Sequence, residues 1–249
     1  MSCLLLLKAL LLTTVAALTP GATPVYSSSG TGGAVSLGAL SPTQPATIAA
    51  GDLLIMHALA YSGDNDTTFS IDTPTGWNAF AGNPYNAAGK VRVWAFSRAA
   101  VGDEDGASVA CTSAGQNAPT GTYAQIHRFT AADGFHPTDP IAGIAFTSGS
   151  GTSLSMPTVT PDGANQLAVC LLALCDGTNG GDILGASTGE SGGDWTQAAE
   201  FSSAAANDGT LQVQTSDQSG GGAISGGTTT SSLSEAWGIL SFRLVPANV

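Results

Sequence analysis

Four short apolar runs, each bounded by turn-forming residues, occur twice in the same order along this chain. The first set is GDLLIMHALA (51–60), TPTGWNAF (73–80), KVRVWAFSRA (90–99) and TYAQIHRF (122–129). The second set is NQLAVCLLAL (165–174), SGGDWTQAAEF (191–201), TLQVQTSDQ (210–218) and EAWGILSFRL (235–244). Short apolar runs between Gly, Pro, Asn and Asp clusters are typical of β-strands. The repeat therefore predicts two four-stranded halves, at about 48–130 and 160–246, that close one jelly-roll-like β-sandwich.

The scarcity of charged residues supports an all-β, antiparallel fold. Only 10% of the residues are Asp, Glu, Lys or Arg, against about 25% in a typical soluble protein. Helices need such residues on their exposed faces, whereas this chain offers Ser, Thr, Asn and 33 glycines. We therefore expect a single β-sandwich domain over residues 25–249.

Alternation within the runs predicts which strand faces are buried. Leu211, Val213 and Thr215 share one face of their run, and Gln212 and Gln214 share the other, which is typical of a half-buried strand. The two opening runs, 53–59 and 167–174, are instead apolar on both faces. One face of each can meet the core of the sandwich. The other face needs a cover, for which long loops, the N-terminal arm and a neighbouring chain are the three options.

Four large apolar residues are expected to anchor the core. Leu240 and Phe242 point inward in the final run, and Trp77 and Trp195 each follow a Gly-containing turn. The two indole rings most simply cap the ends of the core. A platform on which a sugar ring stacks is the alternative for exposed Trp side chains, but no repeated Asp, Asn or Gln pattern accompanies them.

The first 18 residues, MSCLLLLKALLLTTVAAL, form an apolar leader that can be interpreted in three ways. A secretory signal would place its positive charge first, whereas four leucines precede Lys8. A membrane-spanning helix from Leu4 to Leu18 would reach only about 22 Å, short of the ~30 Å hydrocarbon core. A retained docking arm fits best, with a cleaved signal as the alternative. Its docking residues would be Leu4, Leu5, Leu6, Leu7, Leu10, Leu11, Leu12, Val15 and Leu18.

A breaker-rich hinge, Thr19–Pro24, separates this arm from the body, so that residues 1–24 form the arm and hinge. Ser27–Gly33 is expected to be a turn or flexible connector. Burial of the nine apolar side chains of the arm would contribute roughly 10 to 25 kcal/mol before ordering costs, which is enough to anchor a subunit.

The net charge of −12 argues against nucleic acid and anionic lipid as partners, because polyanions would be repelled. The six cationic residues are Lys8, Lys90, Arg92, Arg98, Arg128 and Arg243.

The four cysteines show no metal-binding spacing and no disulfide framework. Cys170 and Cys175 are five residues apart and therefore lie on opposite faces of one strand. We expect Cys3, Cys111, Cys170 and Cys175 to be free and mostly buried thiols.

Enzyme signatures are weak in this sequence. The stretch Gly185–Gly189 (GASTG) matches a nucleophile elbow, which needs a preceding strand, a following helix and a histidine later in the chain. All three histidines, His57, His127 and His136, come earlier. His57 and His127 are expected inside strands and His136 in a turn, so the sequence predicts no catalytic residues.

Two acidic clusters, Asp64–Asp66 and Asp103–Asp105, could supply ligands for calcium, separately or together if their loops meet in space. Neither has the full spacing of an EF-hand loop, so we expect solvated loop charges and neither a metal nor a cofactor.

The leader of the form MxxLLLLK, the Pro/Gly/Ser connector and the runs GDLLI, TPTGW and VRVWAFSRA together resemble structural proteins of tailed bacteriophages, in tail fibres and head decoration proteins. The resemblance covers the leader and the first half of the chain, and the second half only through the internal repeat. It implies a role in assembly and carries no catalytic residues. The chain departs from a long fibre shaft because it has no coiled-coil heptads and no triple-helix repeat.

The sequence therefore predicts a non-enzymatic virion protein, assembled in the host cytoplasm, that attaches to other head or tail subunits through its arm. Self-association is a further option for its partners. The alternative is a secreted carbohydrate-binding or adhesive module whose signal is removed, and a β-sandwich hydrolase is a more distant third option.

Overall fold

The computed structural model describes residues 19–35, 38–62, 69–87, 91–114, 121–175, 183–188, 195–203, 209–218, 222–224 and 226–248. Within these ranges the chain forms strands, turns and loops and no helix. Every strand pairing in this part of the chain is antiparallel. The predicted all-β, antiparallel sandwich is confirmed.

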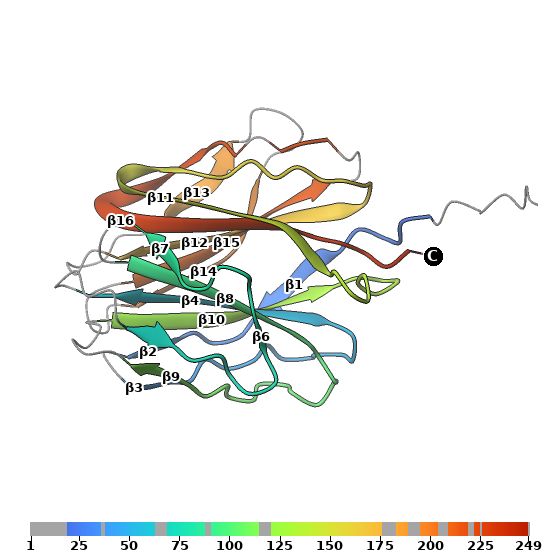
Figure 1. The fold of residues 1–249 in the computed structure, drawn as a ribbon, viewed down its shortest axis with the longest axis horizontal. Coiled ribbons are helices and arrows are strands. Elements are labelled where there is room, and N and C mark those ends of the chain that lie inside the picture. The colour runs from blue at the N-terminus through green and yellow to red at the C-terminus, as the bar shows by residue number, and fades with distance from the viewer. Residues whose placement is uncertain are drawn as a thin grey trace, which may run out of the picture.

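Two large sheets stack face to face, and a small third sheet lies below them (Figure 1). Sheet one has the order β1 (Val25–Ser29), β10 (Gly121–Thr130), β4 (Leu53–Tyr61), β8 (Val91–Ala99) and β6 (Asn78–Ala79), with β2 (Gly33–Val35) beside β10 and β7 (Tyr85–Ala87) beside β8. Sheet two has the order β11 (Ile141–Ser155), β16 (Thr228–Leu244), β12 (Gln166–Cys175), β15 (Gly209–Gln218) and β14 (Thr196–Ser203), with β13 (Ile183–Thr188) beside β16. Sheet three contains β3 (Gly38–Leu40), β9 (Cys111–Ala114) and β5 (Ser70–Ile71).

The two large sheets are built from different halves of the chain. All described strands of sheet one precede residue 131, and all those of sheet two follow residue 140. The central order is β10-β4-β8 in sheet one and β16-β12-β15 in sheet two, so strands at corresponding places in the two halves occupy corresponding places in the sheets. This connectivity differs from a jelly roll, in which successive strands alternate between the sheets. The sheets also have more than the four expected strands each, because β1, β2 and β7 join sheet one and the 15-residue strand β11 and β13 join sheet two.

The inter-sheet core lies between the two large sheets. Leu53 and Ile55 of β4 meet Val169 and Leu171 of β12, and Leu240, Phe242 and Leu244 of β16 pack into the same cluster. The rings of Phe80 and Phe242 stand edge to face across the sandwich, with their centroids 5.2 Å apart. Leu240 and Phe242 have no exposed surface.

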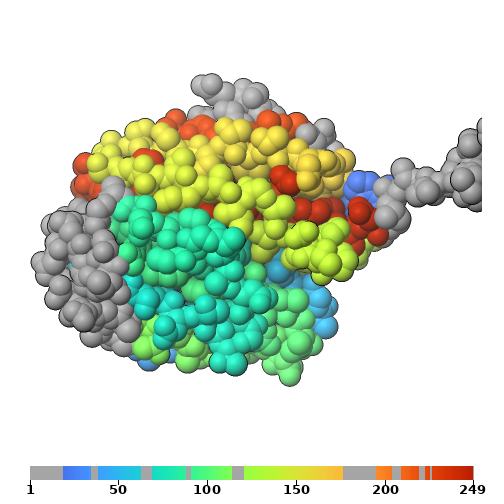
Figure 2. Space-filling view, in the orientation of Figure 1, coloured from blue at the N-terminus to red at the C-terminus, as the bar shows by residue number. Residues whose placement is uncertain are grey.

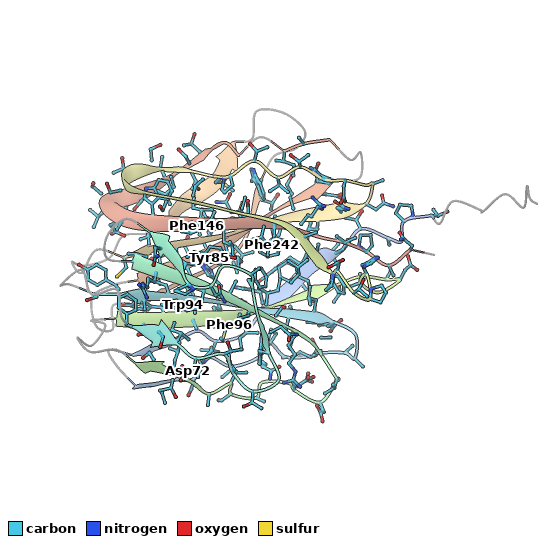
Figure 3. All side chains as sticks on the ribbon, in the orientation of Figure 1. Asp72, Tyr85, Trp94, Phe96, Phe146 and Phe242 are labelled. Atoms are coloured by element: carbon cyan, nitrogen blue, oxygen red, sulfur yellow. The ribbon has the colours of Figure 1, made fainter. Side chains whose placement is uncertain are left out.

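A second core lies on the outer face of sheet one, between this sheet and the segments that cover it. Leu54 and Met56 of β4 and Trp94 and Phe96 of β8 pack against a cover that includes sheet three and Trp77. Trp94 and Phe96 are labelled in Figure 3. The residues of this cover are Leu40, Ile48, Phe69, Ile71, Trp77, Val109 and Cys111.

A third core covers the outer face of sheet two. Cys170 and Leu172 of β12 and Trp237 of β16 pack against Leu154, Met156, Val159, Trp195 and Ile224. Strands β11 and β16 change register at Gly151 and Ser153, where Gly151 adopts a φ of +115° that favours glycine. The second, apolar face of the opening strands β4 and β12 is therefore covered by other segments of the same chain, and not by a neighbouring molecule.

The polar face of β15 is buried, whereas a half-buried strand was expected. Gln212 and Gln214 have no exposed surface. The Gln212 side-chain amide donates to Glu200 Oε2 at 2.7 Å, and the Gln214 amide donates to Gln212 Oε1. Amide side chains that bond to each other satisfy their polar groups without water, so alternation alone did not indicate that this face is covered.

The segment Ser27–Gly33, expected to be a flexible connector, supplies most of β1 and the first residue of β2. Tyr26 pairs with Phe129 and Ser29 with His127 along β10. Backbone pairing with an apolar neighbour orders a serine-rich stretch that has weak strand propensity of its own.

At the front of the molecule, residues near 85 and near 146 meet along the seam between the two large sheets (Figure 2). The rings of Tyr85 in β7 and Phe146 in β11 lie with their centroids 5.2 Å apart and close this seam (Figure 3).

Within the described residues no helix is long and apolar enough to cross a membrane.

Candidate functional site

The hinge Thr19–Pro24 is fixed to one end of the sandwich, beside the C-terminal residues. Gly21 N donates to Ala247 O at 2.7 Å, and Pro20 forms a bridge with Asn248. Ala22 N donates to Asp133 Oδ2 at 2.8 Å, and the Asn165 side-chain amide donates to Gly21 O at 3.1 Å. The structure therefore fixes the point at which the leader joins the body. The leader residues themselves, Leu4, Leu5, Leu6, Leu7, Leu10, Leu11, Leu12, Val15 and Leu18, lie outside the described residues.

Two hollows lie at this end and share His136. The hinge hollow, of about 230 Å³, is lined by Pro20, His136, Asp162, Gly163, Ala164, Gln166, Val245, Pro246 and Asn248. The apolar hollow, of about 320 Å³, is lined by Gly51, Asp52, Leu53, Ala99, Gly134, Phe135, His136, Pro137 and Pro140. These residues come from the start of β4, the end of β8 and the loop after β10, which the topology brings to one end of the sheet.

Asp52 is the buried acid of the apolar hollow. Its side chain accepts from Arg128 Nε at 2.6 Å and from Ala49 N at 2.7 Å, both at Oδ2. Thr47 Oγ1 accepts from Arg128 Nη1 at 3.3 Å, and Thr47 has a positive φ of 61°, which is strained for a β-branched residue. An ion pair and a strained turn thus hold the loop that forms one wall of this hollow.

Asp162 is the exposed acid of the hinge hollow. It accepts from the Gln166 amide at 2.7 Å and pairs with Arg243. The Gln166 hydrogen bond, followed by the Arg243 charge, lowers the pKa of Asp162. Both groups keep Asp162 ionised beside the hinge.

His136 contributes its ring to both hollows. Its Nδ1 atom accepts from Asp139 N at 3.1 Å. A neutral imidazole that accepts at Nδ1 carries its hydrogen on Nε2, so the free side of the ring is a donor. His136 lies in a turn, at the place where the sequence predicts one.

The other two histidines are sealed inside the sandwich. His57 in β4 and His127 in β10 have no exposed surface, and their ring nitrogens have no hydrogen-bond partner. Burial, with a further contribution from His127, lowers the pKa of His57 well below its usual value. Burial lowers the pKa of His127 to about 3. Neutral rings without access to solvent have no route to a substrate.

Trp77 and Trp195 are 6% and 2% exposed and belong to the outer cores of sheets one and two. Trp77 also lines a third hollow, of about 270 Å³, with Gln44, Pro74, Thr75, Arg98, Ser108, Val109 and Ala110. So little exposed indole leaves no face on which a sugar ring could stack.

The acidic cluster Asp103–Asp105 was expected to carry solvated loop charges, but its central residue, Glu104, is buried and has a structural role. Glu104 accepts from the backbone N–H groups of Val101, Gly102 and Asp103 at 2.8 to 3.2 Å and pairs with Arg98 at 2.8 Å. Asp105 Oδ1 accepts from Ile48 N at 2.5 Å. The described residues contain no group of three metal-ligating side chains, and Asp64–Asp66 lies outside them.

The GASTG stretch does not have the geometry of a nucleophile elbow. Gly185–Thr188 belongs to β13, which pairs with β16, and Gly189 lies outside the described residues. A nucleophile elbow instead places its serine at a sharp turn between a strand and a helix.

The described cysteines, Cys111, Cys170 and Cys175, form no disulfide and are buried. Cys170 lies in the outer core of sheet two and Cys175 in the inter-sheet core, on opposite faces of β12. Burial and the nearby Asp72 raise the pKa of Cys111 to about 11, and burial raises the pKa of Cys170. Cys111 and Cys170 are therefore poor nucleophiles at neutral pH.

No family model, curated protein or solved structure matches this chain. The assignment of the two hollows at the hinge as a candidate site therefore depends on the geometry of this molecule alone. Their residues come from separate loops near positions 20, 52, 99, 136, 162 and 246. No local pattern in the sequence identifies them.

Proposed function

We propose that this chain is a non-enzymatic structural protein of a tailed-phage virion, held to head or tail subunits by its N-terminal arm. The main support for this proposal is that residues of the body alone form all three described cores, while backbone hydrogen bonds fix the hinge at one end of the sandwich. The nine apolar residues of the leader are therefore not needed to cover the sheets, which favours a separate docking role for them.

The charges of the described residues fit a displayed, water-facing body. Arg98, Arg128 and Arg243 each pair with a carboxylate of the same chain. Arg92 donates to Phe69 O at 3.0 Å and lies over the Phe69 ring. Because these arginines bind groups of their own chain, the remaining surface charge is acidic. An acidic surface repels polyanions, which supports protein subunits as the partners.

Buried, free thiols support assembly in the host cytoplasm. A reducing compartment keeps such thiols reduced, whereas small exported domains commonly use disulfides. The described cysteines form no disulfide and are all buried.

The test compares particle incorporation of two variants of the full chain. Replacement of Leu4, Leu5, Leu6 and Leu7 by Ser removes about half of the apolar arm, and we expect it to abolish incorporation while the circular dichroism spectrum of the body is unchanged. The matched control replaces Thr13 and Thr14 by Ser and should incorporate normally. Normal incorporation of the leucine variant would overturn the proposed attachment.

The alternative function is a secreted carbohydrate-binding module, and one observation favours it. The hollow beside Trp77 is lined by Gln44, whose Oε1 is buried without a hydrogen-bond partner. A glycan array probed with the purified protein tests this function. Specific binding that is lost in Gln44→Ala and retained in Asn86→Ala, an exposed amide elsewhere, would support the alternative and count against the virion role.

A further inference from the structure

The leader joins the body beside a hollow that suits its chemistry. Pro20, one residue after the start of the described chain, lines the hinge hollow, and His136 belongs to both hollows. The 18 residues before Thr19 could span up to about 60 Å if extended, so they reach either hollow easily.

The walls of the apolar hollow suit large aliphatic side chains. Leu53, Ala99, Phe135, Pro137 and Pro140 provide most of its lining. The hollow has a volume of about 320 Å³. Of its lining residues, Leu53 belongs to the inter-sheet core and Phe135 packs against that core. Leader residues 4–12 contain seven leucines.

Two polar groups at this hollow match a peptide backbone. Asp52 is 7% exposed, and its bonds to Arg128 and Ala49 both use Oδ2. No hydrogen bond within the described residues engages its Oδ1, which remains an acceptor. His136 supplies a donor at Nε2. One acceptor and one donor beside apolar walls fit the N–H and C=O groups of an extended peptide with a leucine side chain.

The charges near the hollows also fit the leader. Lys8 is the only charged side chain among the first 18 residues, and Asp139 is exposed three residues after His136. A covalently joined segment binds at a high effective concentration, typically millimolar for a short flexible connection. This concentration favours the leader of the same chain over that of a second copy.

We propose that leader residues 4–12 dock into the apolar hollow of their own chain before assembly and leave it when they bind the particle. The contact itself stands independently of the virion role, whereas its purpose as a shelter for the arm rests on the proposed function. Docking removes leucine side chains of the leader from water until the partner subunit is available.

The native Cys3 next to these leucines provides a direct test in the full chain. Pro137→Cys places a thiol at the exposed rim of the apolar hollow, and Ala110→Cys places a matched thiol at the exposed rim of the third hollow. Each variant is oxidised with glutathione disulfide at low micromolar concentration and analysed by non-reducing peptide mass mapping. We expect an intrachain disulfide between Cys3 and position 137 that forms at least tenfold faster than the one to position 110.

Further variants make every outcome decisive. Ala99→Cys is a second rim position if Pro137→Cys does not fold, and Leu5→Asp with Leu6→Asp should reduce the rate at either rim to that of the control. Equal rates at positions 110 and 137 would overturn the docking, and interchain disulfides would assign the hollow to the leader of a second copy and overturn the intrachain contact. This experiment contains no virion, so its failure is distinguishable from failure of particle incorporation.

Discussion

His127 in β10 lies diagonally across from His57 in β4, since His57 pairs with Gln125 and His127 pairs with Ile55. Both rings share the face of sheet one that carries Ile55 and Phe129, so they face the inter-sheet core. Neither ring has a hydrogen-bond partner for its nitrogens. Protonation of either of these two neutral imidazoles on adjacent strands would therefore bury an unpaired charge in the core and destabilise the folded protein.

The first prediction is a loss of stability in acid. The folded-state pKa of both rings lies below the usual value of 6.5, so the unfolded chain binds more protons below pH 6.5. The contribution of the two neutral rings to the free energy of unfolding is complete above pH 6.5. It falls as the pH drops toward about 3, by up to about 1.4 kcal/mol per pH unit for each ring. His127→Leu should reduce this slope in urea denaturation between pH 6.5 and 4.5.

The control for the acid prediction is His136→Leu, which changes a partly exposed ring. It should leave the steep slope of the wild-type protein in place. An identical slope in wild type and His127→Leu would contradict the assignment of this acid sensitivity to the buried ring.

The second prediction concerns the inter-sheet core. Phe242→Ala removes a ring that has no exposed surface and meets Phe80 edge to face. We expect the free energy of unfolding to fall by about 3 to 5 kcal/mol. Chemical denaturation provides the measurement, and Leu233→Ala, at a position of the same strand that is 39% exposed, should change it by less than about 1 kcal/mol. Similar effects of both substitutions would contradict the placement of the core.

The third prediction concerns the loop capped by Glu104. Glu104→Gln removes the charge that accepts from three backbone N–H groups and pairs with Arg98. We expect a loss of about 2 kcal/mol at pH 7. Burial acts to raise the pKa of Glu104, but the backbone hydrogen bonds and Arg98 outweigh it and lower the pKa. The stabilisation is therefore present above the ordinary pKa and disappears as the pH falls below it.

Asp103→Asn is the control for Glu104, since the Asp103 side chain is exposed in the same loop. Thermal unfolding at pH 7 and pH 3 compares the two variants with the wild-type protein. A Glu104→Gln protein that is as stable as wild type at pH 7 would exclude the capping role.

The fourth prediction concerns strain in the loop next to Asp52. Thr47→Asn places a residue that tolerates positive φ where a β-branched residue now has a φ of 61°. We expect stabilisation by about 1 kcal/mol, reduced somewhat by loss of the bond to Arg128. Thr47→Val keeps the β-branch and should be no more stable than wild type. Thermal unfolding compares the three proteins, and a destabilised Thr47→Asn would refute the strain.

The strands with strong apolar patterns could be predicted from the sequence, and the segments that cover them could not. The runs that became β4, β8, β10, β12, β15 and β16 have dense apolar residues between turn signals. In contrast, β11 (Ile141–Ser155) is rich in Gly and Ser and owes its conformation to pairing with β16. The sequence also indicated that β4 and β12 are apolar on both faces, but which segments cover them depends on long-range contacts.

The site divides in the same way. The leader could be recognised because nine large apolar residues cluster in one short segment. The hollows beside its hinge could not, because Asp52, Ala99 and His136 are far apart in the chain and meet only when β4, β8 and the loop after β10 reach the same end of the sheet.

The most direct test of the central claim is mass spectrometry of this protein in purified tailed-phage particles from an infected culture. We expect the protein to be present in the particles, with peptides that cover leader residues 4–18. Absence from the particles, or recovery only from the culture medium as a chain that begins near Thr19, would contradict attachment through a retained arm.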